Sequence, residues 1–266
     1  MKLSVSNIVW GKENFGDFLK ILKNEGCDGV ELAPSLIWDE PISSNKNERQ
    51  ELKKKISDSG LEFIGFHSLL FSKPELQLFK NEQSRKKTIE YINDLINVCS
   101  DLGGKNIVFG SPNNRSLNGK NYKICLSQSY DDFSRIAEYA KEKDIFFCIE
   151  PLGENYTDFI TSVGEGGDLV KKIDHSNFRL HLDTKTIFHT KEDMEKIVHK
   201  YGQLIQHVHI SDNDLCEPGT INMEHKTISE SLKKINYKKY LSIEMKKSSI
   251  KSLISGIKFV KSTYIS

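Results

Sequence analysis

Short apolar segments alternate with longer amphipathic segments along the whole chain. The apolar segments are rich in Ile, Val, Leu and Phe, which is typical of short strands that are buried on both faces. We expect strands at residues 3–7, 29–32, 62–67, 106–110, 145–150, 179–183, 205–210 and 240–244.

The amphipathic segments between these strands predict helices. Residues 88–96 place apolar side chains at the i, i+3, i+4 and i+7 positions of one helix face. Gly26, Gly60 and Gly103 follow three of the segments, where glycine commonly ends a helix. The predicted helices span residues 15–23, 48–59, 82–102, 127–143, 165–173, 191–200, 226–235 and 250–262.

Regular alternation of strand and helix predicts parallel strands that are joined by right-handed crossovers. Eight such units in 266 residues favour one closed (β/α)8 barrel over an open doubly wound sheet. No glycine-rich nucleotide loop follows the first strand, and no linker divides the chain, so we expect one domain over residues 1–266. The long connections 33–46, 111–126, 151–163 and 211–225 all follow strands, at the barrel end where active sites lie.

Composition and charge exclude several classes of protein. Lys and Arg number 38 against 37 Asp and Glu, and this net charge of +1 provides no field to attract nucleic acid or an anionic membrane. No apolar run reaches the roughly 18 residues of a membrane span, and the first residues resemble no export signal. The five cysteines are scattered, without CxxC spacing. We expect a cytoplasmic protein with reduced thiols, and neither nucleic acid nor a membrane as its partner.

Ionisable residues lie at the ends of six of the predicted strands, in otherwise apolar surroundings. Period-two alternation directs these side chains into the barrel. The same alternation places His181 and His207 one layer deeper, where they would support the ligands or pack the core. The six residues are Glu31, His67, Glu150, Asp183, His209 and Glu244.

A metal ion would balance this buried charge. Ionised carboxylates inside a barrel cost several kcal/mol each unless a cation is near, and Arg179 is the only Lys or Arg in the predicted strands. Three carboxylates and one imidazole suit Mn²⁺ best, with Mg²⁺, Co²⁺ and Zn²⁺ as alternatives. The sequence therefore predicts one divalent metal site at Glu150, Asp183, His209 and Glu244.

The segments around these residues resemble the xylose-isomerase-like TIM barrels, a superfamily that includes sugar isomerases and epimerases. The resemblance runs over essentially the whole chain. The order and spacing of the four proposed ligands are most similar to those of the ketose 3-epimerases, in which the matching residues bind one divalent metal. The segments that carry the resemblance are GVEL at 29–32, LEFIGFHSLL at 61–70, IEPL at 149–152, LHLDT at 180–184, HVHISD at 207–212 and LSIEM at 241–245.

The resemblance implies a metal-dependent sugar isomerase or epimerase. Glu150 and Glu244 would act as acid and base on either side of a metal-stabilised ene-diolate of a sugar or sugar phosphate. A homodimer is a further expectation from the resemblance. The expected substrate contacts are Glu31, His67, Tyr156, Lys185 and His225.

Two of these contacts have plain alternatives, because Lys185 also fits a solvated lysine and His225 an exposed histidine that caps a helix. The chain also departs from the ketose 3-epimerases at three substrate positions. Tyr156, Thr186 and Leu215 stand where those enzymes carry a glutamate, a histidine and an arginine.

Two other functions remain open at this point. An inosose-type dehydratase would use the same metal and the same proton abstraction, followed by loss of a hydroxyl group. A barrel that only binds its ligand is the non-catalytic alternative. The endonuclease IV group of the superfamily needs three zinc ions and more histidines than this chain offers, so a role in DNA repair is set aside.

Overall fold

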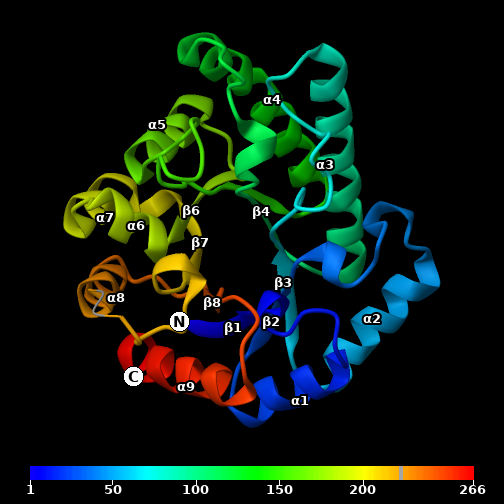
Figure 1. The fold of residues 1–266 in the computed structure, drawn as a ribbon, viewed down its shortest axis with the longest axis vertical. Coiled ribbons are helices and arrows are strands. Elements are labelled where there is room, and N and C mark those ends of the chain that lie inside the picture. Colours follow the sequence, from blue (N-terminus) through cyan, green and yellow to red (C-terminus); the bar gives the residue numbers. More distant parts are fainter. Residues whose placement is uncertain (222–223) are drawn as a thin grey trace.

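The computed structural model describes residues 1–221 and 224–266, and in these ranges eight parallel strands close into a barrel (Figure 1). Each strand pairs with its neighbours in sequence, and the last strand pairs with the first. The fold expected from the alternating pattern is therefore confirmed. The strands are β1 (Lys2–Ser6), β2 (Gly29–Leu32), β3 (Glu62–Phe66), β4 (Asn106–Phe109), β5 (Phe146–Ile149), β6 (Phe178–Asp183), β7 (Ile205–Ile210) and β8 (Tyr240–Ile243).

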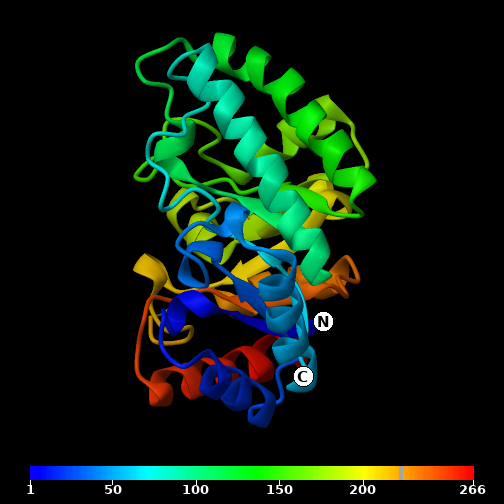
Figure 2. The same ribbon diagram turned by 90° about the vertical axis from the view of Figure 1, so that its right-hand side faces the viewer.

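Helices form an outer ring around the strands (Figures 1 and 2). Their apolar faces and the outward side chains of the strands make one continuous core between the two layers. The helices of the described ranges are α1 (Phe15–Asn24), α2 (Lys46–Asp58), α3 (Glu82–Leu102), α4 (Tyr122–Glu142), α5 (Val163–Ile173), α6 (Thr184–Thr190), α7 (Met194–Tyr201), α8 (His225–Lys234) and α9 (Ile250–Val260).

Two helix predictions need correction. Helix α4 begins at Tyr122 and not at residue 127, because the Asn121 side chain accepts hydrogen bonds from the first free backbone N–H groups of the helix. The helix expected at 191–200 corresponds to α7 and begins only at Met194. Lys191 adopts a left-handed conformation directly after α6, and the Asp193 side chain caps α7.

The missed helix α6 begins directly at the end of a strand. Asp183 is both the last residue of β6 and the N-cap of α6, since its Oδ1 accepts a hydrogen bond from the Lys185 backbone N–H. A turn this tight leaves no loop residues for the pattern of hydrophobic positions to reveal. It holds the Asp183 side chain at the rim of the barrel.

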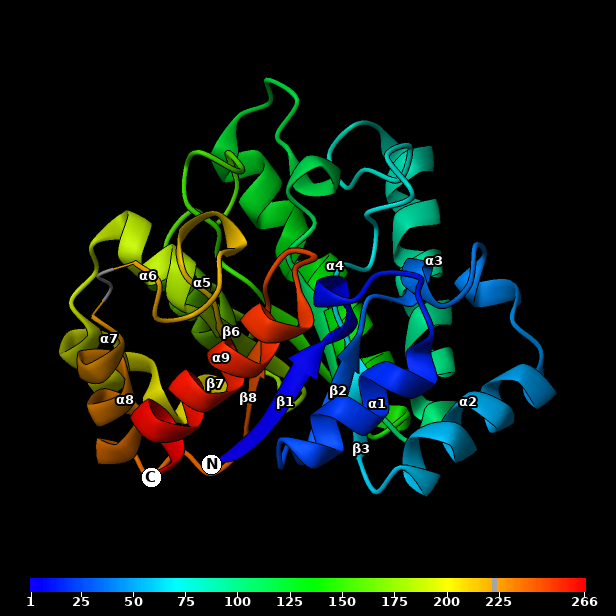
Figure 3. The same cartoon turned by 60° about the horizontal axis from the view of Figure 1, so that its bottom comes forward.

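The connections that follow the strands gather at one end of the barrel, away from both chain termini (Figure 3). They include the segments between β2 and α2, β4 and α4, β5 and α5, and β7 and α8. None of the helices in the described part of the chain is both long and apolar enough to cross a membrane.

Gly65 in β3 is required for the close approach of β4. Its Cα is the register partner of Asn106, and a Cβ atom at this position would overlap the Asn106 carbonyl oxygen. Its φ of +151° is also one that residues with side chains rarely adopt.

We expect Gly65→Ala to lower the free energy of unfolding by about 3 kcal/mol or more, because the clash is with backbone that cannot move without opening the sheet. Gly164→Ala is the matched control, since this glycine lies in α5, where a Cβ meets only ordinary contacts and alanine favours the helix. Urea unfolding, followed by circular dichroism, measures the free energy of unfolding of both variants. Equal stability of the two variants would contradict this role of Gly65.

Candidate metal centre

Four ionisable side chains converge at the carboxyl ends of neighbouring strands. Asp183 and His209 lie in β6 and β7, whereas Glu150 and Glu244 directly follow β5 and β8. All four are buried, and one potential ligand atom from each lies within 4.8 Å of the others. The structure thus brings together the four residues that the sequence predicts as metal ligands.

The atoms of this cluster that are buried from solvent have other ionisable groups as their neighbours. Lys185 Nζ lies 2.7 Å from Asp183 Oδ2, and His209 Nδ1 lies 3.3 Å from Glu244 Oε2. The opposite oxygen of Asp183 is held, because it accepts from the backbone N–H of Lys185 and from Ser211 Oγ at 3.1 Å. Three carboxylates and an imidazole that converge in this way form a donor set that fits a divalent cation.

Gly110, which follows β4, makes room for the fourth ligand. A Cβ atom there would overlap Oε2 of Glu150. The backbone of Glu150 is held as well, because the guanidinium group of Arg115 donates a hydrogen bond of 2.7 Å to its carbonyl oxygen. The side chain of Arg115 is fully buried, and burial lowers its pKa to about 10. The sequence pattern did not predict the roles of Gly110 and Arg115. An arginine in a loop carries no periodic signal that predicts burial.

Glu31 lies beneath the cluster rather than at the substrate side. It is inaccessible to solvent, and its two carboxylate oxygens lie 3.1 Å from His207 Nε2 and 3.0 Å from His209 Nε2. A carboxylate on Nε2 fixes that nitrogen as the donor and leaves Nδ1 of His209 free to face the centre. The expectation that Glu31 contacts the substrate therefore has no support in its position.

Histidines fill the barrel below and beside His209. The His181 ring packs against His209 with a centroid separation of 4.2 Å, and burial together with its histidine neighbours holds the pKa of His181 well below its ordinary value. His67 lies at the rim, with Nε2 2.6 Å from Ser6 Oγ and Nδ1 3.2 Å from Glu244 Oε1. These contacts hold the Glu244 carboxylate from a second side.

The two glutamates have opposite electrostatic environments. Burial and the nearby Glu244 carboxylate raise the pKa of Glu150 to about 8. Burial opposes the charge on Glu244 as well, but His209 and Lys185 outweigh it and hold the pKa of Glu244 well below its ordinary value. The site thus separates the proton affinities of two neighbouring carboxyl groups, an arrangement common at acid–base centres.

A cavity of about 320 Å³ opens over the cluster. Glu150 and Glu244 form its floor, and His67, Tyr156 and Lys185 are among the residues of its wall. Three of the five expected substrate contacts therefore line this cavity. Lys185 is not a solvated lysine, because it is only 6% exposed and its ammonium group lies 2.7 Å from Asp183 Oδ2.

His225 does not line this cavity. It is the first residue of α8, and its ring nitrogens lie 2.6 Å from Asp212 Oδ1 and 2.7 Å from Tyr264 Oη. The alternative of an exposed capping histidine is wrong, because His225 is buried. Asp212 also accepts hydrogen bonds from the backbone of Gly219 and Ile221, so this network closes the loop after β7.

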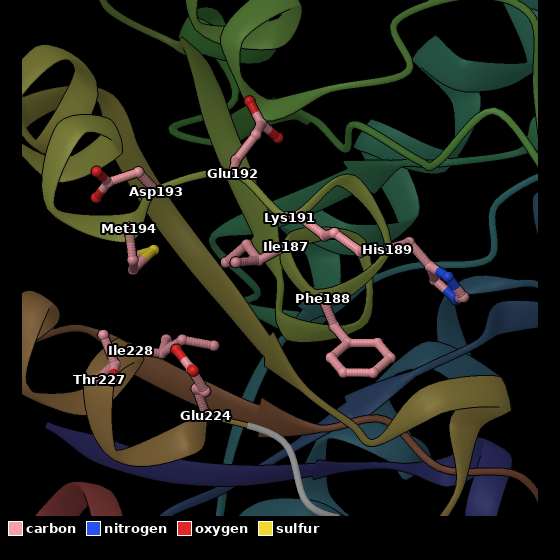
Figure 4. Close-up of a pocket in the computed structure, with 10 residues that line it drawn as sticks. All are labelled: Ile187, Phe188, His189, Lys191, Glu192, Asp193, Met194, Glu224, Thr227 and Ile228. Carbon is pink, nitrogen blue, oxygen red and sulfur yellow. The ribbon is translucent and has the colours of Figure 1, made fainter.

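A second cavity, of about 610 Å³, lies between α6, α7 and α8, at the side of the barrel (Figure 4). Ile187 of α6, Met194 of α7 and Ile228 of α8 are among the residues that line it. It is larger than the cavity over the cluster, but it contains none of the predicted site residues. The smaller cavity is the candidate site, because Glu150 and Glu244 of the cluster line it.

The closed parallel barrel, with carboxylates and a histidine at the carboxyl ends of its strands, defines the class of protein: a (β/α)8 barrel with a candidate metal centre. The family model described as xylose isomerase-like TIM barrel matches residues 19–263. The chain therefore belongs to the xylose isomerase-like TIM barrel family, as its sequence motifs predict.

Curated relatives of this chain are sugar epimerases. The 3-dehydro-D-guloside 4-epimerase of Escherichia coli K12 is 22% identical over 260 residues, which cover 92% of each chain. The D-psicose 3-epimerase of Enterocloster bolteae is 21% identical over 244 residues, covering 89% of this chain and 79% of the relative. These relatives agree with the expected class of sugar isomerase or epimerase.

Solved structures show the same fold. A D-psicose 3-epimerase from Clostridium cellulolyticum H10, solved with D-tagatose, superposes with a TM-score of 0.85 at 18% identity and covers 99% of both chains. The apo form of an Escherichia coli 3-keto-D-glucoside 4-epimerase gives 0.84 at 18% identity, over 98% of this chain and 99% of that one.

We expect Glu31→Ala to lower the free energy of unfolding by about 3–5 kcal/mol, because it leaves His207 and His209 buried without their shared carboxylate. Glu31→Gln keeps a hydrogen-bond acceptor and should cost less. Glu13→Ala removes only a surface ion pair with Lys247 and should change stability by less than about 1 kcal/mol. Urea unfolding of the three variants tests the ranking, and a loss for Glu31→Ala no larger than for Glu13→Ala would refute it.

Proposed function

We propose that the protein is a divalent-metal-dependent epimerase or isomerase that acts on a sugar or sugar derivative in the cavity at the carboxyl end of the barrel. One observation carries the proposal. One potential ligand atom each from Glu150, Asp183, His209 and Glu244 lies within 4.8 Å of the others, and Glu150 and Glu244 also line an open cavity. The sugar epimerases among the relatives support the reaction class.

Glu150, Asp183, His209 and Glu244 would hold the metal. Their three carboxylates and one imidazole favour Mn²⁺ among the available divalent ions, with Mg²⁺, Co²⁺ and Zn²⁺ as alternatives. A bound divalent ion supplies Lewis-acid stabilisation of the negative charge that develops on the sugar oxygens when a neighbouring carbon loses its proton. Glu31 and Ser211 hold His209 and Asp183 in place from outside the cluster.

Glu150 and Glu244 would move the proton. They follow β5 and β8, with β6 and β7 between them, so that they approach a substrate on the cavity floor from two directions. One carboxylate removes a proton from the carbon next to the carbonyl group, and the other delivers a proton to the same carbon or to the next. Delivery to the same carbon gives an epimer, and delivery to the next gives an isomer.

The wall of the cavity would bind the substrate. His67, Tyr156 and Lys185 present polar groups to it, and sugar hydroxyls and carbonyl oxygens are the groups that such side chains bind. Leu152 and Leu215 also line the cavity and give it an apolar side. We place this enzyme in the cytoplasm, where its five free thiols would stay reduced.

We expect about one divalent metal ion per chain in the purified protein, and its loss in Asp183→Ala, because Asp183 contributes one of the four potential ligands. Elemental analysis after dialysis against metal-free buffer, with and without added Mn²⁺, measures the stoichiometry. Asp214→Ala is the matched control, since Asp214 lies at the cavity wall outside the cluster. A wild-type protein that retains no metal even after addition of Mn²⁺ would refute the metal-dependent reaction.

We expect Glu150→Gln and Glu244→Gln each to lower turnover by about 10²–10⁴-fold, the usual contribution of a well-placed acid or base. Ketoses, 3-keto-glycosides and sugar phosphates in deuterated water form the substrate panel, and NMR and mass spectrometry detect deuterium at the reacting carbon. Glu154→Gln, an exposed residue of the loop after β5, is the control and should leave turnover unchanged.

Product mass separates the two enzymatic alternatives. An epimerase or isomerase preserves the substrate mass apart from exchanged deuterium, whereas an inosose-type dehydratase yields a product lighter by one water. Full turnover by both Gln variants, with native near-ultraviolet circular dichroism, would exclude the acid–base assignment.

A further inference from the structure

Lys185 places a positive charge inside the carboxylate cluster. Its Nζ lies 2.7 Å from Asp183 Oδ2 and 3.8 Å from Glu244 Oε2, and its side chain is 8% exposed. Among the described residues, it is the only Lys or Arg that forms an ion pair with any of the four cluster residues. The other lysine pairs of the chain differ, as in Lys86–Glu82, where both side chains are mostly exposed.

The position of Lys185 is fixed by the start of α6. Its backbone N–H donates to Oδ1 of Asp183 at 2.8 Å, and its ammonium group reaches Oδ2 of the same carboxylate. One residue therefore engages both oxygens of Asp183. The buried amine has carboxylate oxygens of Asp183 and Glu244 at 2.7 and 3.8 Å, which are the partners that a buried ammonium group needs.

The ammonium group addresses the same atoms that face the centre of the cluster. Asp183 Oδ2 and Glu244 Oε2 are carboxylate oxygens of two of the four residues that make the cluster fit a divalent cation. A divalent ion and an ammonium group that share two carboxylate oxygens repel each other strongly, because both are positive and the surroundings exclude water. The two cations cannot both be neighbours of these oxygens at low cost.

We propose that Lys185 is an internal counter-ion that competes with the divalent metal for Asp183 and Glu244, so that metal binding requires its ammonium group to leave these carboxylates. The inference rests on the metal site of the proposed function. It gives Lys185 a second role in addition to substrate contact, namely to set the affinity of the centre for its metal and to neutralise the carboxylates when no metal is bound.

The cavity wall offers a new position to the displaced group. Lys185 Nζ lies 5.7 Å from the centroid of the Tyr156 ring, and Tyr156 Oη lies 3.4 Å from Asp214 Oδ1. An aromatic face and a carboxylate together attract an ammonium ion. In this position the amine would face the substrate cavity, so that metal loading and the presentation of a hydrogen-bond donor to oxygen-rich substrates would be coupled.

Lys185→Met tests the competition directly, with Mn²⁺ alone as the probe. Isothermal titration calorimetry of the chelator-treated full chain should give a Mn²⁺ dissociation constant at least tenfold lower than that of the wild type. Lys185→Arg keeps a positive charge that cannot be lost and should show no such tightening. Lys196→Met, an exposed lysine of α7, is the matched control and should bind like the wild type. Asp183→Ala in the Lys185→Met background should abolish binding, which places the measured ion at the cluster.

Thermal unfolding provides a second readout that does not depend on catalysis. Without metal, Lys185→Met should melt at a lower temperature than the wild type, because the buried carboxylates lose their counter-ion. Added Mn²⁺ should raise its melting temperature by more than it raises that of the wild type. If Lys185→Met does not fold without metal, refolding in Mn²⁺ and Lys185→Gln provide the same comparison.

The outcomes separate this inference from the proposed function. Equal or weaker Mn²⁺ binding by Lys185→Met, with normal binding by the wild type, overturns the competition and leaves the metal-dependent reaction intact. Binding by Lys185→Met alone supports the competition and refutes metal dependence of the wild type. Binding by neither protein overturns both.

Discussion

Negative charge buried at one end of the barrel is the constraint on which the arrangement of the site depends. Glu31, Glu150, Asp183 and Glu244 are all removed from bulk water, and an isolated carboxylate in such a place would be protonated or would destabilise the fold. Positively charged or polar neighbours stabilise these carboxylates at each level of the barrel interior. Histidines surround Glu31, and Lys185 and His209 lie against the upper carboxylates.

The layers of this charge network depend on one another. Glu31 orients His209 through Nε2, His209 then turns Nδ1 to Glu244, and His67 holds the second oxygen of Glu244. Burial alone would raise the pKa of both upper glutamates, yet it raises only that of Glu150, because Glu244 has the cations beside it. The difference between the two glutamates therefore originates from His209, which does not line the cavity, together with Lys185 and His67, which do.

The sequence was sufficient to predict the elements that have a regular pattern of hydrophobic residues. Strands buried on both faces appear in the sequence as apolar runs. The ends of these runs predict which side chains meet at the rim of the barrel, and the sequence alone therefore groups Glu150, Asp183, His209 and Glu244. Residues outside the strands have no such signal. The sequence gives no sign that Arg115 is buried or that Lys185, expected as a substrate contact, also pairs with Asp183, because the fold of the loop after β4 and the tight turn into α6 decide these positions. The contacts of His225 could not be predicted either, since its partners Asp212 and Tyr264 are distant in sequence.

The divergent positions of the chain lie in the part of the site that strands do not build. Tyr156 and Leu215 line the cavity from loops after β5 and β7, and Lys185 lines it from the first turn of α6. A side chain on a loop can change without disturbing the hydrogen bonds of the barrel, whereas a change at Asp183 or His209 disturbs the cluster, the cap of α6 and the link to Glu31 together. The barrel can thus retain one set of reactive groups while its rim adapts to different sugars. Lys185 joins the two parts, because its backbone N–H donates a hydrogen bond to Asp183 and its side chain lines the cavity.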